Sequence, residues 1–217
     1  MLITLEGIEG GGKTSQIANM VAFIESRGYA CRTTREPGGT AIGTQIRGVL
    51  LNPANHDLDP LSELLLYVAD RVQHIQAVIA PRLAAGDVVL CDRFFDATLV
   101  YQGYARGLDK TLIRDLHRLV CRNLTPDLTL LFDLEPEVGL ARAWRQIDNG
   151  GRTGLESRFE EEKIDFHRKV RDGYLELARL VPERFRRIDA GQDRRQVADA
   201  VISALAEFLD KRSCRKP

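Results

Sequence analysis

Eight residues near the start of the chain have the spacing of a phosphate-binding loop. Residues 7–14 read Gly-Ile-Glu-Gly-Gly-Gly-Lys-Thr, which matches the pattern G-x-x-x-x-G-K-[ST]. Glycines let backbone N–H groups turn inward around a phosphate, and the start of the next helix adds unpaired N–H groups and a positive dipole end. Lys13 can reach the β- and γ-phosphates of a nucleotide, and the Thr14 hydroxyl can bind Mg²⁺. The motif predicts a nucleoside triphosphate site made of Gly7, Ile8, Glu9, Gly10, Gly11, Gly12, Lys13, Thr14 and Ser15.

A second charged position follows an apolar run in the middle of the chain. Val88-Val89-Leu90-Cys91 precede Asp92 and Arg93. A buried strand that ends in an acid is the pattern of a Walker-B strand, so we expect Asp92 to help hold Mg²⁺ opposite Thr14. Arg93 comes directly after it and can grip a phosphate. The polar and aromatic residues 94–103 that follow are suited to lining a pocket.

Two further groups of residues have the chemistry to hold a second ligand. Arg35, Glu36 and Pro37 precede two glycines, and Pro-Gly-Gly enforces a turn. Tyr67 and Arg71 are four residues apart and share a helix face, which could hold a nucleobase by stacking and hydrogen bonding. The alternatives are a turn with a surface ion pair for the first group, and a core tyrosine beside a solvated arginine for the second.

The segment between Arg142 and Arg158 combines arginines with flexible glycines. Such a segment, residues 145–158, can act as a lid that closes over phosphates and withdraws to release product. The alternative is a solvated connection between two helices. Several phosphates brought together need more positive charge than one lysine and one Mg²⁺ supply, which favours the lid. Further along, Gln192 follows a tight turn after the last predicted strand and could border an adenine ring.

These positions are placed by alternating short apolar runs and longer segments with helical spacing. Strands are predicted over residues 2–6, 30–35, 88–92, 128–134 and 185–189. Helices are predicted over residues 13–27, 41–51, 61–85, 109–122, 136–147, 159–180 and 193–211. Strands separated by helices favour parallel pairing with crossover helices on both faces of the sheet, within one domain over residues 1–217. Ligands on such an α/β sheet collect at the carboxyl ends of the strands, which is where the motifs above lie.

Composition limits the classes of function. The 217 residues carry 31 Lys and Arg against 31 Asp and Glu, so the net charge is zero, which argues against broad attachment to nucleic acid or to an anionic membrane. No segment approaches the eighteen or so apolar residues of a membrane span. The four cysteines are widely spaced and are expected to be reduced thiols in a cytoplasmic protein.

Taken together, the chain resembles the bacterial thymidylate kinases, which phosphorylate dTMP to dTDP with ATP. The resemblance runs from the first strand to the last helix. It is carried by the phosphate loop, residues 34–40 (Thr-Arg-Glu-Pro-Gly-Gly-Thr), Asp92-Arg93-Phe94 with Tyr101-Gln102-Gly103, and Arg158-Phe159-Glu160. It implies an α/β fold of the P-loop NTPase type, with a five-stranded parallel sheet flanked by helices and a short arginine-rich lid. It also implies a homodimer, a requirement for ATP and Mg²⁺, and dTMP as acceptor.

The resemblance also implies roles for individual residues. For the acceptor these are Tyr67 stacked on the base, Arg71 on a base carbonyl, Thr98 and Gln102 at the base edge, Tyr101 beneath the deoxyribose, Arg93 on the phosphate with Arg35 nearby, and Glu9 near the sugar and phosphates. Arg158 matches the lid arginine of the subtype whose phosphate loop carries no arginine, which agrees with glycine at residues 10–12. Ala97 stands where relatives often carry Ser, and Tyr67 replaces the commoner Phe.

The predicted mechanism is in-line phosphoryl transfer with Lys13, Mg²⁺ and Arg158 on the γ-phosphoryl group and Arg93 on the acceptor. Arg158→Ala is then expected to lower kcat on the order of 10³-fold. Two alternatives stay open. One is a kinase of the same fold acting on dUMP, a deoxynucleoside or another small acceptor. The other is a nucleotide-dependent switch, against which stands the lack of an N-K-x-D-type motif.

Overall fold

A computed structural model describes residues 1–150 and 154–213 of the chain, and its sheet has the predicted number of strands. Five parallel strands pair in the order β2-β3-β1-β4-β5. Their bounds are β1 Leu2–Glu6, β2 Cys31–Arg35, β3 Val88–Asp92, β4 Leu128–Asp133 and β5 Phe185–Asp189. The α/β prediction is therefore confirmed. The central strands β1 and β4 are buried along their whole length, as expected for a sheet that is covered on both faces.

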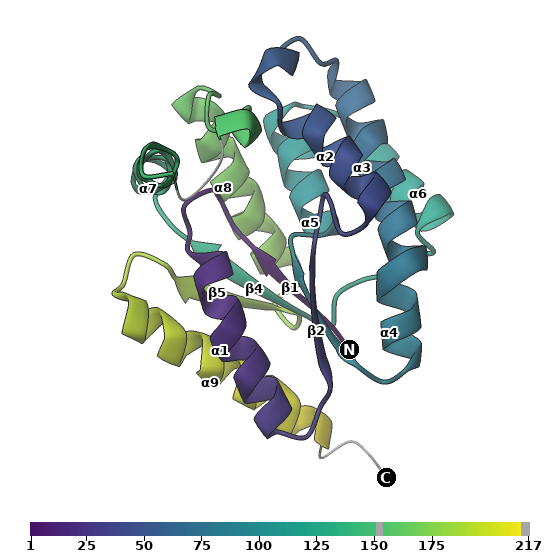
Figure 1. The fold of residues 1–217 in the computed structure, drawn as a ribbon, viewed down its shortest axis with the longest axis vertical. Helices are drawn as coiled ribbons and strands as arrows, with labels where there is room; N and C mark the ends of the chain where they lie inside the picture. The colour runs from purple at the N-terminus through teal and green to yellow at the C-terminus, as the bar shows by residue number, and fades with distance from the viewer. Residues whose placement is uncertain (151–153, 214–217) are drawn as a thin grey trace.

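The helices form two layers around the sheet (Figure 1). On one face, α1 packs against α9. The other face is covered by α3, α4, α6 and α8 and by the helical segments around η3 (Leu99–Ala105). The helix bounds are α1 Lys13–Ser26, α2 Ala41–Leu51, α3 Pro60–His74, α4 Ala80–Ala84, α5 Phe95–Thr98, α6 Lys110–Val120, α7 Pro136–Asp148, α8 Ile164–Leu180 and α9 Arg194–Ser213, with short 3₁₀ turns η1 Pro53–Asn55 and η4 Gly154–Glu156. Among the described residues, no helix combines the length and apolar character needed to cross a membrane.

Two predicted helices differ from the observed ones. The single helix expected over residues 61–85 is interrupted by a π-helical segment, η2 Ile75–Ile79, before α4 begins. The helix expected from residue 159 begins at Ile164, because residues 157–163 form turns that carry Arg158 and Phe159 into the interior.

A second π-helical segment, η3 Leu99–Ala105, lies between α5 and α6. Its widened turn is closed by the Arg106 N–H, which donates to the Tyr101 carbonyl 2.9 Å away. Such i→i+5 turns are rare in proteins overall, and those that occur are often found at functional sites. η3 packs against α8 and carries Tyr101 and Gln102, both buried.

The strand register brings the motifs to one edge of the sheet. Asp92 pairs with Leu5 of β1 and with Arg35 of β2. The loops that leave β1, β2 and β3 therefore start side by side, and these loops carry the phosphate loop, the Pro-Gly-Gly turn and Arg93.

Candidate active site

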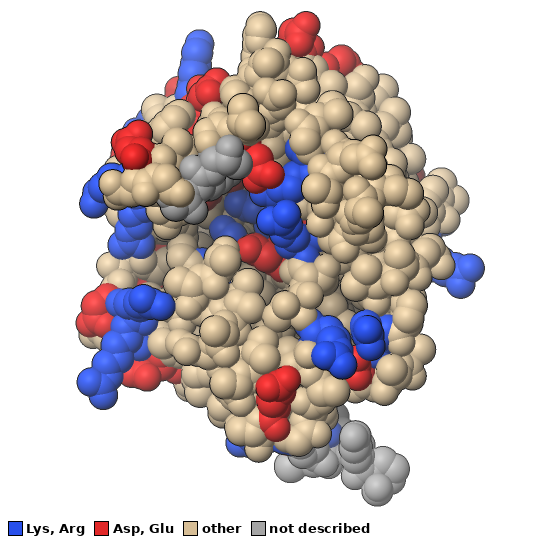
Figure 2. Space-filling model, viewed as in Figure 1, with Lys and Arg blue, Asp and Glu red and all other residues tan. Residues whose placement is uncertain are grey.

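The carboxyl ends of the strands open into one cleft of about 730 Å³, within the size range of small-molecule sites. Figure 2 shows a hollow on this face of the molecule with basic side chains inside it. The predicted site residues that line the cleft are Glu9, Gly10, Gly11, Gly12, Lys13, Thr14, Ser15, Arg35, Glu36, Pro37, Tyr67, Arg71, Asp92, Arg93, Thr98, Tyr101 and Gln102. The structure thus brings together segments that are far apart in the sequence.

The phosphate loop needs glycine because neighbouring backbone lies close to it. Gly10 has a φ of 68°, and a Cβ there would lie 2.0 Å from the carbonyl oxygen of Gly139 in α7. Lys13 is buried, and its Nζ donates to the carbonyls of Gly7 and Ile8 at 3.0 and 2.7 Å. Burial, together with the charge of Arg93, lowers the pKa of Lys13 to about 8. Two backbone bonds hold this ammonium group at the mouth of the loop, where a third N–H can meet an anion.

A hydroxyl and a carboxylate face each other beside the loop. The Thr14 Oγ1 donates to Asp92 Oδ2 at 3.2 Å, so the predicted metal ligands are adjacent. Within the described ranges, no group of three or more His, Cys, Asp or Glu side chains could hold a metal ion by itself. A hydroxyl and a carboxylate fit a hard cation such as Mg²⁺, which takes one or two protein oxygens and completes its shell with water and phosphate.

Arg93 is held in a conformation that non-glycine residues seldom adopt. Its φ is 68°, which costs on the order of 1 kcal/mol and is found most often at functional sites. Its Nη2 donates to Glu9 Oε1 at 2.9 Å and its Nη1 to the Tyr174 hydroxyl at 3.3 Å. Tyr101 donates to the same Glu9 oxygen at 2.6 Å. Arg93 is therefore fixed from two sides before any ligand binds.

The pKa values of two carboxyl groups behind Arg93 are shifted in opposite directions. Glu6 is fully buried, and burial with the nearby charge of Asp96 raises its pKa to about 8. Burial also disfavours the charged form of Glu9, but Arg93 outweighs it, with help from His167 and Tyr101, and holds the pKa of Glu9 well below its usual range. Glu9 is thus an anion that anchors Arg93, whereas Glu6 accepts hydrogen bonds from Tyr174 and from the Phe94 N–H.

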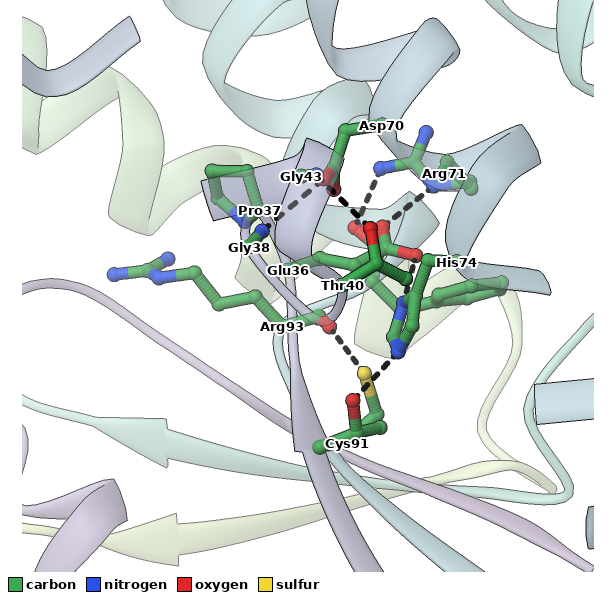
Figure 3. Close-up of polar contacts among 12 residues, drawn as sticks. Glu36, Pro37, Gly38, Thr40, Gly43, Asp70, Arg71, His74, Cys91 and Arg93 are labelled. Atoms are coloured by element: carbon green, nitrogen blue, oxygen red, sulfur yellow. Dashed lines mark hydrogen bonds and ion pairs between the residues drawn. The ribbon is translucent and has the colours of Figure 1, made fainter. Parts of the chain in front are cut away.

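Arg71 lies at the other end of the cleft and is 2% exposed. Its Nε donates to Glu36 Oε2 at 2.8 Å, as Figure 3 shows from the side of β2, and its Nη2 donates to Thr98 Oγ1 at 2.8 Å. The guanidinium carbon also lies 5.3 Å from the centre of the Phe94 ring. Tyr67, one turn earlier on α3, is half-buried, and burial raises the pKa of its hydroxyl. An aromatic ring and a fixed donor fork therefore form the wall opposite the phosphate loop.

Arg158 is not among the residues that line the cleft. Its Nη2 donates to Glu63 Oε2 and its Nε to the Leu50 carbonyl, both at 2.5 Å, and its side chain is buried. The buried carboxylate of Glu63 on α3 keeps this guanidinium in the interior. The structure therefore gives Arg158 a different place from the one expected of a lid arginine on a phosphate.

Other arginines line the donor side of the cleft instead. Arg142 and Arg145 of α7 both lie on it, and Arg142 Nη1 donates to the Ala190 carbonyl at 2.9 Å. Gln192 is exposed and donates to Asp189 Oδ2 at 2.9 Å, outside the cleft lining. Within the predicted lid of residues 145–158, residues 151–153 lie outside the described ranges.

The sequence did not point to two polar residues that shape the site, Arg47 and Glu63. Arg47 lines the cleft, pairs with Glu156 at 2.8 Å and donates to the Pro37 carbonyl at 3.0 Å. Glu63 accepts from Gln102 Nε2 at 2.7 Å as well as from Arg158. Both residues lie in ordinary amphipathic helices. Their role in the site is evident only from their hydrogen-bond partners, which are about 40 to 110 positions away in the sequence.

Comparison with known proteins gives one consistent result. The family model described as thymidylate kinase matches residues 5–201. A thymidylate kinase of Desulfosudis oleivorans is 54% identical over 210 residues, covering 97% of this chain and 98% of that protein. One of Desulforapulum autotrophicum is 52% identical over 209 residues, covering 96% and 92%. A crystal structure of thymidylate kinase from Ehrlichia chaffeensis superposes with a TM-score of 0.73 at 34% identity, covering 95% of this chain and 98% of that one.

Proposed function

The chain belongs to the thymidylate kinase family, and we propose that the cleft between the phosphate loop and α3 is where it transfers the γ-phosphoryl group of ATP to dTMP. The protein is a nucleoside monophosphate kinase that converts dTMP to dTDP. The observation that best supports this site is the presence of Lys13, Arg93 and Arg71 on one cleft. Two anionic ligands can be bound there at the same time, one of them with its base beside Arg71.

The acceptor is a phosphate monoester, whose second pKa is about 6. It is mostly dianionic at neutral pH and needs no general base. The protein has to align donor and acceptor oxygens and to stabilise the charge on the phosphoryl group in transit. Lys13 binds the donor phosphates, and Arg93, braced by Glu9 and Tyr174, binds the acceptor phosphate. Arg35 is exposed at the cleft edge and adds charge there.

Thr14 and Asp92 would hold Mg²⁺ with the donor phosphates. When bound, the ion neutralises charge on the β- and γ-phosphate oxygens. The Thr14–Asp92 hydrogen bond already sets these two oxygens 3.2 Å apart. Either Thr14→Val or Asp92→Asn is expected to raise the Mg²⁺ concentration needed for half-maximal activity.

Arg142 and Arg145 take the role at the γ-phosphoryl group that the sequence resemblance suggested for Arg158. Both are on α7, whose last residues overlap the predicted lid of residues 145–158, and both line the cleft. Arg158 anchors the end of the lid to α3 through Glu63.

The acceptor base lies between Tyr67 and the polar edge formed by Arg71, Thr98 and Gln102. Glu36 and Pro37 belong to the same wall. Tyr101 is buried under the sugar position, with its hydroxyl held by Glu9 at 2.6 Å. A ring in this place leaves no room for a 2′-hydroxyl, which favours deoxynucleotides.

The direct test is to measure ADP release with ATP and Mg²⁺ in the presence and absence of dTMP. We expect release that depends on dTMP and forms dTDP in equal amount. Lys13→Ala should abolish it, whereas Lys211→Ala, on the exposed surface of α9, should not. Failure of the unmodified protein to phosphorylate dTMP would refute the proposal.

Two alternatives give different results in the same assay. A kinase for another acceptor would prefer dUMP, thymidine, AMP or a ribonucleotide in a substrate panel. A nucleotide-dependent switch would release ADP at a rate that ignores dTMP. The base wall of Tyr67 and Arg71 supports a nucleotide acceptor over a switch, and the substrate panel decides which nucleotide is preferred.

We also propose a homodimer located in the cytoplasm. Of the large apolar side chains that are exposed in the described residues, Ile42 and Val49 on α2, Leu61 and Leu65 on α3, and Leu112, Leu119 and Val120 on α6 belong to neighbouring helices. Exposed apolar side chains on neighbouring helices favour a protein partner, and a second copy of the chain would cover them. Light scattering should give twice the mass of 24.3 kDa, and Leu119→Asp should give the single mass. The buried free thiols Cys31, Cys91 and Cys121 support a reducing compartment.

A further inference from the structure

His74, the last residue of α3, lies behind the base wall and is completely buried. Its Nδ1 lies 2.9 Å from Glu36 Oε1, and its Nε2 lies 2.6 Å from Thr34 Oγ1. Figure 3 shows the imidazole between Glu36 and β2, one helical turn below Arg71. Both ring nitrogens are therefore occupied, and one of them points to the carboxylate that holds Arg71.

The partners decide which nitrogen carries the proton. Glu36 is paired with Arg71 at 2.8 Å and is a hydrogen-bond acceptor, so Nδ1 must be the donor. The Thr34 hydroxyl, which can donate or accept, is the partner of Nε2. The chain of contacts runs Thr34, His74, Glu36, Arg71.

Each oxygen of the Glu36 carboxylate has its own donor. Oε2 accepts from Arg71 and Oε1 from His74. Glu36 is 3% exposed, so an oxygen without a donor would not be compensated by water. Without His74 the carboxylate would turn to share its remaining donor, and Arg71 would turn with it.

The orientation of Arg71 matters because its donors are divided between protein and cleft. Nε serves Glu36, and Nη2 serves Thr98 at 2.8 Å and the Phe94 carbonyl at 3.3 Å. Across the described part of the chain, no hydrogen bond is formed by Nη1, and Arg71 lines the cleft. The two N–H groups of Nη1 remain for the ligand, and they can be aimed at an acceptor atom only while the other three are held.

The neighbouring loop is shaped around the histidine. A Cβ on Gly39 would lie 2.4 Å from both Cδ2 and Nε2 of His74. Asp70, also on α3, accepts from the Gly38 N–H at 3.1 Å. The second glycine of Pro-Gly-Gly therefore admits the imidazole, and α3 holds the loop that carries Glu36.

We propose that His74 is a positioning residue for acceptor recognition, which holds Glu36 and through it the Nη1 donors of Arg71 toward the base. The inference rests on the proposed function of the cleft. His74 touches no substrate. Its contribution should appear in the binding of dTMP and not in that of ATP, whose loop lies at the other end of the cleft.

The test compares His74→Leu, His74→Asn and Thr34→Val in steady-state kinetics and in calorimetric binding of dTMP. His74→Leu removes both hydrogen bonds, so kcat/KM for dTMP should fall about 10- to 100-fold, mainly through KM, with little change in the KM for ATP. His74→Asn keeps a donor near the Nδ1 position and should recover most of the loss. Thr34→Val removes the partner of Nε2 and leaves the contact with Glu36, so it should have a smaller effect of the same kind.

Val201→Ala serves as the matched control for lost stability. Val201 is buried in α9 on the opposite face of the sheet, and its truncation should lower the Tm without changing the ratio of the two KM values. The proposal is overturned if His74→Leu leaves the KM for dTMP unchanged, raises both KM values equally, or is not rescued by His74→Asn. If the unmodified protein fails to phosphorylate dTMP, the proposed function fails first, and binding of dTMP to the His74 variants still decides the positioning role.

Discussion

The variant Arg158→Ala distinguishes a role of this residue in stability from a role in phosphoryl transfer, and the structure favours the role in stability. Arg158→Ala would leave Glu63, which is 0% exposed, without its closest cation. Breaking a buried ion pair from one side costs about 3–5 kcal/mol. Arg106 stays 3.4 Å from the same oxygen and Gln102 2.7 Å from the other, so we expect about 3 kcal/mol, the lower end of that range. For a chain of this length, this corresponds to a Tm lower by roughly 6–12 °C.

The effect on turnover should be smaller than that of removing an arginine from a transferring phosphoryl group. Such an arginine contributes about 10³-fold or more to kcat, whereas Arg158 is held by Glu63 and Leu50 away from the cleft lining. We expect kcat to stay within about tenfold of the unmodified enzyme when assayed well below the new Tm. Urea unfolding and the dTMP-dependent release of ADP measure the two quantities separately.

The double variant Arg158→Ala/Glu63→Gln provides the control. Replacing the stranded carboxylate by a neutral amide should recover roughly 1–2 kcal/mol of the free energy of unfolding. A variant of Arg158 that unfolds like the unmodified protein but loses turnover about 10³-fold would refute this reasoning and return Arg158 to the γ-phosphoryl group.

Three other predictions concern the arginines of α7 that line the cleft, the buried carboxyl group of Glu6, and the hydroxyl group of Tyr101. Arg142→Ala and Arg145→Ala should each lower kcat about 10²- to 10³-fold with little change in Tm, because both line the cleft; steady-state kinetics and thermal unfolding check this. The pKa of Glu6 is raised from 4.5 to about 8, so the folded state binds more protons than the unfolded state between these values and the free energy of unfolding falls as pH rises through that range. Glu6→Gln should flatten this fall, as measured by urea unfolding at pH 5 and pH 8, and an unchanged slope would contradict it. Tyr101→Phe removes the 2.6 Å hydrogen bond to Glu9 and should lower kcat/KM for dTMP about tenfold. Because the ring remains, the variant should still prefer the deoxynucleotide over its ribose analogue in a substrate comparison.

The fold was predictable because its signals are local. The apolar runs that became β1, β3 and β5 have the predicted bounds, and the phosphate loop is a contiguous motif whose geometry follows from its glycines. The interruption of α3 by η2 was not predictable, because a π-turn keeps the same residue types and changes only which carbonyl each N–H meets.

The site was predictable wherever a residue follows a strand, and less so where its place depends on a distant partner. Arg93 and Asp92 are fixed by β3, and both line the cleft. Arg158 has the composition of a lid arginine, but Glu63, 95 positions away, holds it in the interior. His74 reads as one more polar residue of an amphipathic helix, and only its contact with Glu36 singles it out.

The widened turn of η3 holds one residue more than an ordinary α-helical turn. The chain therefore cannot be shortened within η3 without moving the side chains that η3 carries. A single deletion between residues 99 and 105 would let this segment relax to an ordinary α-helix. Side chains within the former wide turn would then take different positions around the helix axis. Tyr101 would leave Glu9, or Gln102 would leave Glu63, depending on which residue was lost. A shortened homologue would therefore have to build its sugar and base contacts from different positions.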